Sequence, residues 1–203
     1  MNKQTSVQAL KIFFTNQKIP PMKGIIFTEF GEMVEATFGF DTWDAIVEKA
    51  DLPSGGSYTA VGTYDHGEIV SLVVNLSEET NTPVPDLLQA FGTYLFHRFG
   101  KLYPSFLEGE DRALGFLSRV EDHIHVEVRK LYPQAELPRF DTRWISDNEL
   151  EMIYHSNKHL EDVAEGLIRG CLEHFGEEGE VTREDAGDSA EEGVRFLVKV
   201  TSA

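Results

Sequence analysis

The chain has 203 residues, a formal net charge of −17 and a single cysteine, Cys171. This length suits one domain with a substantial core, and the negative charge argues against binding to nucleic acid or to anionic membranes. One cysteine excludes an internal disulfide and any multi-cysteine zinc or iron–sulfur site, which fits a reducing cytoplasm. No apolar run approaches the roughly 20 residues of a membrane helix, and we recognise no signal peptide.

The N-terminal half is predicted to be helical. Residues 1–21 end in Ile-Pro-Pro and are interpreted as an N-terminal extension. Helical spacing of apolar residues then predicts four helices, over residues 22–38, 41–50, 66–80 and 84–99. In the second helix we expect Trp43, Ile46 and Val47 to face inward. Residues 51–64 contain Pro-Ser-Gly-Gly-Ser and are predicted to form a loop.

The next predicted helix carries two histidines one residue apart, His123 and His125. Apolar residues at three- and four-residue steps predict one continuous amphipathic helix that ends before Pro133. These residues are Ala113, Leu117, Val120, Ile124, Val128 and Leu131. Each histidine lies about 100° from Ile124, on either shoulder of the apolar stripe. Periodicity does not choose between them, and each suits either a half-buried hydrogen-bonded histidine or a metal or haem ligand.

After Pro138 the apolar period changes from helical to alternating, which predicts a hairpin. The alternating residues are Phe140, Thr142 and Trp144, followed after a turn by Leu150, Met152 and Tyr154. A helix is predicted over 158–175, and two more strands near 180–184 and 194–200. The predicted fold class is therefore α+β, with an N-terminal helical half and a C-terminal four-stranded antiparallel sheet crossed by a helix.

Few segments of the sequence suggest a catalytic or cofactor-binding site. The phosphate-binding loops and the nucleophile elbow have no match in the sequence, and His155 and His159 straddle a predicted strand–helix boundary, so we interpret them as surface residues. Tyr154, Ser156 and Lys158 follow one another at two-residue steps along a predicted strand edge. This spacing would direct two hydroxyls and a cation to one side, as the propionates of a haem require. The alternative is an ordinary strand end with an N-cap serine.

Three motifs together resemble the haem nitric oxide/oxygen-binding (H-NOX) family, which is related to the haem domain of soluble guanylate cyclase. They are Met-Lys-Gly-Ile-Ile-Phe from Met22, His-Ile-His-Val-Glu-Val-Arg-Lys-Leu-Tyr-Pro from His123, and Tyr-x-Ser-x-Lys from Tyr154. They occur in the order and spacing of the family. The similarity runs from Met22 to the C-terminus, so the resemblance implies a single H-NOX domain over residues 22–203.

The resemblance implies a haem b (iron protoporphyrin IX) cofactor with His125 as its iron ligand. It further implies that Pro138 distorts the porphyrin, and that Ile26 and Leu167 pack against it. Tyr154, Ser156 and Lys158 match the propionate-binding motif. The family has arginine where this chain has Lys158, and a lysine offers one point charge in place of a two-pronged hydrogen bond.

The resemblance to the family also implies an apolar gas pocket. Oxygen-binding members of the family resemble one another in a tyrosine that donates a hydrogen bond to bound oxygen, and this chain has Val163 at that position. Phe30 and Leu95 occupy the other positions of the pocket at which members of the family have polar residues. A pocket without a donor favours nitric oxide over oxygen, with carbon monoxide as a further ligand.

The expected function is therefore haem-based sensing of nitric oxide, with signalling to a separate partner. The resemblance implies a histidine kinase or a cyclic-di-GMP enzyme as that partner, in the bacterial cytoplasm. One alternative is a haem-free interaction module with the same fold. Another is a haem peroxidase, but that chemistry needs an acid–base residue near the iron, which Val163, Leu95 and Phe30 do not provide.

Overall fold

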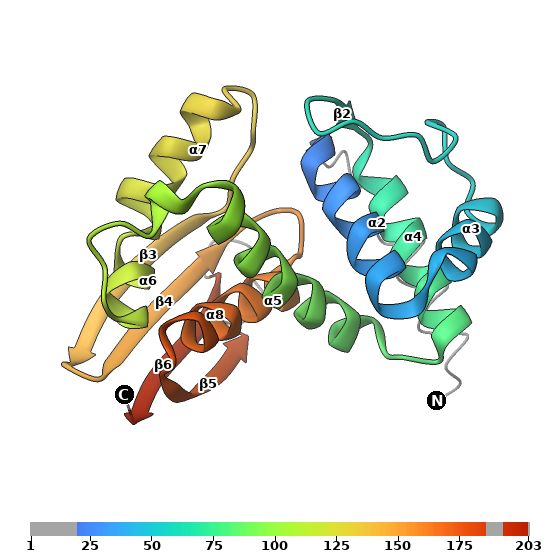
Figure 1. Cartoon of the computed structure of the whole chain (residues 1–203). Helices are drawn as coiled ribbons and strands as arrows, with labels where there is room; N and C mark the ends of the chain where they lie inside the picture. Colours follow the sequence, from blue (N-terminus) through green and yellow to red (C-terminus); the bar gives the residue numbers. More distant parts are fainter. Residues whose placement is uncertain (1–19, 186–192, 203) are drawn as a thin grey trace. The chain divides into compact units, whose positions relative to one another are not determined.

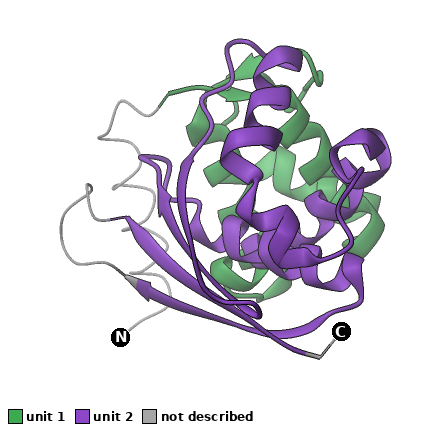
Figure 2. Ribbon diagram, turned by 90° about the vertical axis from the view of Figure 1, so that its left-hand side faces the viewer, with its two compact units in different colours: residues 1–87 green, residues 88–203 purple. Residues whose placement is uncertain are grey.

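The computed structural model describes residues 20–185 and 193–202, and the chain divides into two compact units, residues 1–87 and 88–203 (Figures 1 and 2). We call them unit 1 and unit 2. Of the predicted extension, residues 1–21, only the last two lie within the described residues. No helix in the described part of the chain is long and apolar enough to span a membrane.

Unit 1 is helical, as the sequence predicts. Its elements are β1 (Met22–Lys23), α2 (Gly24–Phe38), α3 (Phe40–Lys49), β2 (Thr63–Tyr64), α4 (His66–Thr80) and the start of α5 (Val84–Leu102). The prediction for α4 is confirmed at both ends, since the Asp65 side chain accepts a hydrogen bond from the Gly67 N–H and caps the helix. The prediction missed the short antiparallel pairing of β1 with β2, and α5 ends at Leu102 rather than at residue 99.

The core of unit 1 lies between its helices. Fully buried side chains from α2, α3 and α4 fill it, among them Phe27, Phe30, Ile46, Leu72 and Leu76. In α3 the prediction of an inward face is confirmed for Ile46, whereas Trp43 and Val47 are only half-buried. The rings of Phe27 and Tyr58 stack, with centroids 4.6 Å apart, so the loop after α3 also packs onto α2.

Unit 2 combines helices with a four-stranded antiparallel sheet and confirms the α+β prediction. The strands are β3 (Arg139–Ser146), β4 (Glu149–His155), β5 (Glu178–Asp185) and β6 (Val194–Ser202), in the spatial order β3-β4-β6-β5. β3 and β4 form the predicted hairpin, in which Phe140 lies opposite Tyr154. The helices of this unit are the rest of α5, a short 3-10 turn (Pro104–Phe106), α6 (Ala113–Ser118), α7 (His125–Leu131) and α8 (Glu161–Phe175).

One face of the sheet is covered by α6 and α8 (Figure 1). The buried core there includes Leu114, Leu150, Cys171, Phe196 and Val198, which come from both helices and the two central strands. The start of α6 is fixed by the buried carboxylate of Glu177, which accepts a hydrogen bond from the Ala113 N–H (2.9 Å). This anchoring fixes the chain just before the segment that contains His125.

Candidate functional site

His125 is a buried histidine with one ring nitrogen engaged. It is the first residue of α7 and is 8% exposed. Its Nδ1 lies 3.0 Å from Glu121 Oε2. Within residues 20–185 and 193–202, its other nitrogen, Nε2, makes no hydrogen bond. His123, the other candidate, is half-buried, and its side chain makes no hydrogen bond to any described residue.

The Glu121 carboxylate holds the ring of His125 in one protonation state. Burial opposes ionisation of Glu121, but the Phe140 N–H, His125 and Arg129 together lower the pKa of this carboxyl. Burial also lowers the pKa of His125, although Glu121 opposes that shift. An ionised carboxylate can only accept, so Nδ1 carries the proton and the lone pair of the neutral ring is on Nε2. This is the tautomer that a histidine ligand of iron through Nε2 requires.

The backbone before His125 is not the continuous α-helix that the sequence predicts. α6 ends at Ser118, and Val120–Ile124 forms a π-helical turn, in which the His125 N–H donates to the carbonyl of Val120, five residues back. The Thr142 hydroxyl donates a hydrogen bond to the Ser118 carbonyl (3.4 Å). In a continuous α-helix this carbonyl would instead accept from a backbone N–H four residues later. The predicted boundary position is therefore wrong for His125, which is buried, whereas His123 is half-buried as predicted. The π-turn, and not simple periodicity, places His125 in the interior.

Aromatic rings link His125 to the Tyr-x-Ser-x-Lys segment. The ring centroids of His125 and Phe140 lie 6.0 Å apart, and those of Phe140 and Tyr154 lie 5.4 Å apart. Tyr154 is buried, and that burial raises the pKa of its hydroxyl to about 12. The hydroxyl is therefore protonated at neutral pH and can donate a hydrogen bond.

Ser156 and Lys158 do not lie on a strand, contrary to the sequence prediction. β4 ends at His155, and the Ser156 hydroxyl oxygen accepts a hydrogen bond from the Lys158 N–H (3.1 Å), which forms a turn. The helix predicted to begin near Lys158 begins at Glu161, because His159 adopts a left-handed backbone conformation with φ of 50°. Lys158 is buried, and its ammonium group donates to the Glu136 carbonyl (3.1 Å). Burial lowers the pKa of Lys158 against the opposing effect of Glu136.

The helices that carry Leu95, Val163 and Leu167 approach each other closely. α5 and α8 meet at Gly92 and Gly166, where a Cβ on Gly92 would lie 2.2 Å from the Val163 carbonyl oxygen. Leu95 is buried, and Val163 and Leu167 are half-buried. All three side chains are hydrocarbon, so none can donate a hydrogen bond.

Three further residues from the sequence prediction lie elsewhere. Pro138 is in the loop between α7 and β3, two residues before Phe140, and is half-buried. Ile26 and Phe30 lie on α2 of unit 1, where Phe30 is fully buried. The roles of these residues toward a haem stay predictions.

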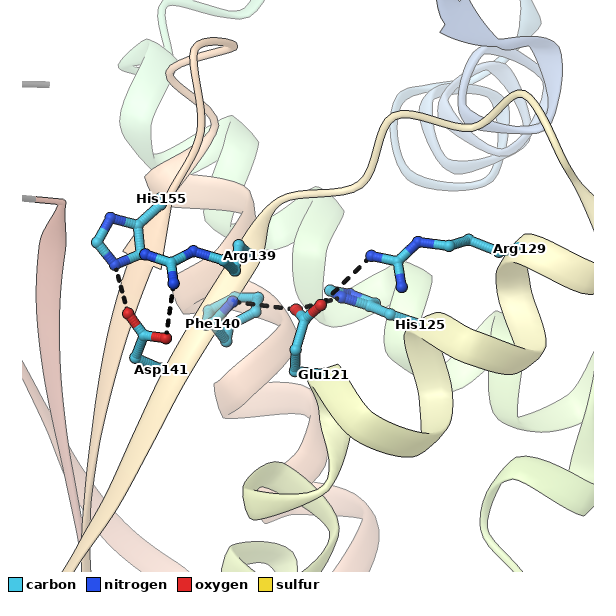
Figure 3. Close-up of polar contacts among 7 residues, drawn as sticks. All are labelled: Glu121, His125, Arg129, Arg139, Phe140, Asp141 and His155. Carbon is cyan, nitrogen blue, oxygen red and sulfur yellow. Dashed lines mark hydrogen bonds and ion pairs between the residues drawn. The ribbon is translucent and has the colours of Figure 1, made fainter. Parts of the chain in front are cut away.

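Glu121 was not predicted as a site residue from the sequence. Its carboxylate contacts His125, the Phe140 N–H (3.1 Å) and Arg129 (3.3 Å), so it joins α7 to the start of β3 (Figure 3). The sequence does contain a signal for it, since four residues separate Glu121 from His125 and this step places two side chains on one face of a helix. Beside it, Asp141 binds Arg139 and His155, each at 3.0 Å (Figure 3).

Known proteins resemble this chain over most of its length. A family model described as haem-NO-binding matches residues 23–183. The unliganded Fe(II) H-NOX protein from K. algicida is 37% identical, with 90% of this chain and 98% of that chain covered and a TM-score of 0.83. No relative was found among curated proteins.

Two further solved structures extend the comparison. The H-NOX protein from Shewanella woodyi, bound to IWP-051 in the Fe(II)CO state, is 39% identical, covering 88% of this chain and 94% of that chain with a TM-score of 0.75. The H-NOX protein from S. oneidensis in the Fe(II)NO state is 27% identical, covering 89% and 100% with a TM-score of 0.81. The chain therefore belongs to the haem-NO-binding (H-NOX) family, whose members are haem-binding gas-sensor domains and not enzymes.

Proposed function

We propose that this protein binds haem b through His125 and senses nitric oxide. The observation that carries the proposal is the environment of the His125 ring, which is buried with Nδ1 3.0 Å from the Glu121 carboxylate, while Nε2 makes no hydrogen bond to any described residue. The residue as a whole is buried, but Nε2 itself is not enclosed by protein atoms, so it is accessible to a ligand. The residues present therefore fit a haem.

The chain offers groups for the other parts of a haem. The Tyr154 and Ser156 hydroxyls can donate to the propionates, and Lys158 can supply a positive charge to them. Lys158 would then exchange its present partner, Glu136, for a propionate. Ile26, Leu167 and Pro138 are proposed to pack against the porphyrin, which is a large apolar surface that needs apolar neighbours.

The gas pocket is proposed to favour nitric oxide. When bound, a haem would supply a ferrous iron that can bind a diatomic gas. Bound oxygen carries partial negative charge and gains from a hydrogen-bond donor, whereas nitric oxide does not need one. Phe30, Leu95 and Val163 have no donor groups. The S. oneidensis and S. woodyi relatives, solved as Fe(II)NO and Fe(II)CO complexes, support nitric oxide and carbon monoxide as ligands.

Movement of His125 is proposed to carry the signal. Glu121 connects the first turn of α7 to the Phe140 N–H of β3, close to the loop that contains Pro138. A displacement of the His125 ring therefore pulls on α7 and on the start of β3 together. These elements are the proposed two-state part of the protein, and their shift would be read by a separate histidine kinase or cyclic-di-GMP enzyme.

Replacing each of the two neighbouring histidines with glycine, in separate variants, tests which one binds the haem iron. The full chain is reconstituted with haem as wild type, His125→Gly and His123→Gly, and ferrous absorption spectra are recorded with and without added imidazole. We expect His125→Gly to lose the histidine-ligated spectrum and to regain it with imidazole, while His123→Gly keeps it. The reverse pattern would overturn the assignment to His125. Absence of a haem spectrum in the wild type would support a haem-free interaction module.

A further inference from the structure

The half-buried carboxylate of Glu121 contacts the ring of His125 and two further donors, the Phe140 N–H and Arg129. We propose that Glu121 is a positioning residue that sets the strength of the bond between His125 and the haem iron, through its hydrogen bond to Nδ1. The proposal rests on the proposed function, because it assumes that Nε2 of His125 binds the iron.

The contact between the two side chains is specific. Glu121 Oε2 lies 3.0 Å from His125 Nδ1, and the Glu121 side chain is 25% exposed while that of His125 is 11% exposed. The π-turn over Val120–Ile124 contains Glu121 and leads directly into His125. The backbone feature that buries the histidine therefore also positions its carboxylate partner.

Three donors share this one carboxylate. Oε2 accepts from His125 and from the Phe140 N–H (3.1 Å), and Oε1 accepts from the Arg129 guanidinium (3.3 Å). When a histidine binds a metal through one ring nitrogen, a carboxylate can accept a hydrogen bond from the other ring nitrogen. This hydrogen bond raises the basicity of the ring and strengthens its bond to the metal. The Phe140 N–H and Arg129 withdraw negative charge from the same carboxylate, so they weaken this effect. The strength of the iron–histidine bond is thus open to adjustment in both directions.

This adjustment has a consequence for sensing. The proposed signal depends on displacement of His125, and the ease of that displacement depends on the strength of its bond to iron. A residue that strengthens the bond makes the resting state harder to leave. Glu121 would therefore set the threshold of the response, whereas Phe30, Leu95 and Val163 would set which gas binds.

Three substitutions separate this role from a merely structural one. Glu121→Gln keeps the shape of the side chain but replaces the charged acceptor with a neutral one. Arg129→Gln removes a competing donor that is 45% exposed, so the fold should tolerate it. Glu127→Gln is the matched control, because Glu127 lies on the same helix two residues after His125 and, among the described residues, its side chain pairs only with the exposed Lys130.

The readouts are the iron–histidine stretching frequency of the ferrous protein, by resonance Raman spectroscopy, and the rate of haem transfer to an excess of haem-free myoglobin. We expect Glu121→Gln to lower the frequency and to accelerate haem loss about 10- to 100-fold, the usual effect of removing an outer-shell partner of a metal ligand. Arg129→Gln should raise the frequency, and Glu127→Gln should leave both readouts at wild-type values.

The outcomes distinguish this inference from the proposed function. If Glu121→Gln and Arg129→Gln both retain the wild-type frequency in a histidine-ligated haem, Glu121 only anchors the helix and the inference fails alone. Equal shifts in Glu121→Gln and Glu127→Gln would also overturn it, because the effect would then be one of net charge. If the wild-type protein shows no iron–histidine band, the proposed function itself fails.

Discussion

Replacing Gly92 with alanine should destabilise unit 2, because α5 and α8 meet there backbone to backbone. A Cβ on Gly92 would lie 2.2 Å from the Val163 carbonyl oxygen, which is about 1.2 Å inside the 3.4 Å at which ordinary contact begins. The Gly166 Cα and the Leu167 backbone nitrogen, each at 2.8 Å, close the other directions. No side chain can rotate away from these contacts, so the two helices must separate.

The expected cost can be estimated from opposing effects. Overpacking a well-packed contact costs about 1–3 kcal/mol, and a rigid backbone contact should fall at the upper end. Alanine gains about 1 kcal/mol over glycine in a helix interior, which opposes the loss. We therefore expect Gly92→Ala to lower the free energy of unfolding by about 2 kcal/mol. For a chain of this size this corresponds to a fall in Tm of about 4–8 °C.

Gly100→Ala is the matched control on the same helix. Its Cβ would approach only the Leu107 Cδ1 atom, at 3.1 Å, and that methyl group lies at the end of a flexible side chain. We expect its stability to stay within about 1 kcal/mol of wild type. Urea denaturation followed by circular dichroism measures both variants. If Gly92→Ala is as stable as Gly100→Ala, the close approach of α5 to α8 in the structure is wrong.

Two further predictions concern single side chains. Val163→Tyr should introduce a hydrogen-bond donor into the proposed gas pocket and raise oxygen affinity about fivefold to tenfold; an unchanged oxygen affinity, measured by absorption titration, would contradict the placement of Val163. Burial, assisted by the charge of Glu177, raises the pKa of the Cys171 thiol, so iodoacetamide at pH 8 should label it only after unfolding. Rapid labelling of the folded protein would refute this prediction. Because the thiol ionises at a lower pH in the unfolded chain than in the folded one, the contribution of Cys171 to the free energy of unfolding should fall as the pH rises above about 9. The Cys171→Ala variant should not show this fall.

The sequence predicts those elements whose limits are encoded locally. The limits of α4 follow from the Asp65 cap and from its apolar spacing, and the structure reproduces both of them. The β3–β4 hairpin likewise follows from alternation around a turn of polar residues. In these segments, nearby residues decide the backbone conformation without help from distant ones.

The parts that the sequence does not predict depend on contacts between distant segments. The π-turn before His125 is accompanied by hydrogen bonds from β3, where Thr142 donates to Ser118 and the Phe140 N–H donates to Glu121. Apolar periodicity contains no information about those partners. The same holds for Lys158, whose buried ammonium is bound by Glu136, 22 residues earlier in the chain.

The candidate site divides in the same way. The motif pattern singled out His125 and Tyr154, and the structure links the two through the ring of Phe140. It did not single out Glu121, because carboxylates are abundant in this acidic chain and only the fold shows which one contacts the ring. Side chains that bind the cofactor directly are thus easier to find from sequence than the residues that hold them in place.

The absorption spectrum of the reduced, haem-loaded protein, recorded under argon, in air and with nitric oxide, tests the central claim most directly. A haem held by His125 beside a pocket without donors should give a five-coordinate ferrous spectrum that air leaves unchanged and nitric oxide alters. A stable oxygen complex would contradict the proposed preference for nitric oxide over oxygen. Failure to bind haem at all would contradict the proposed function.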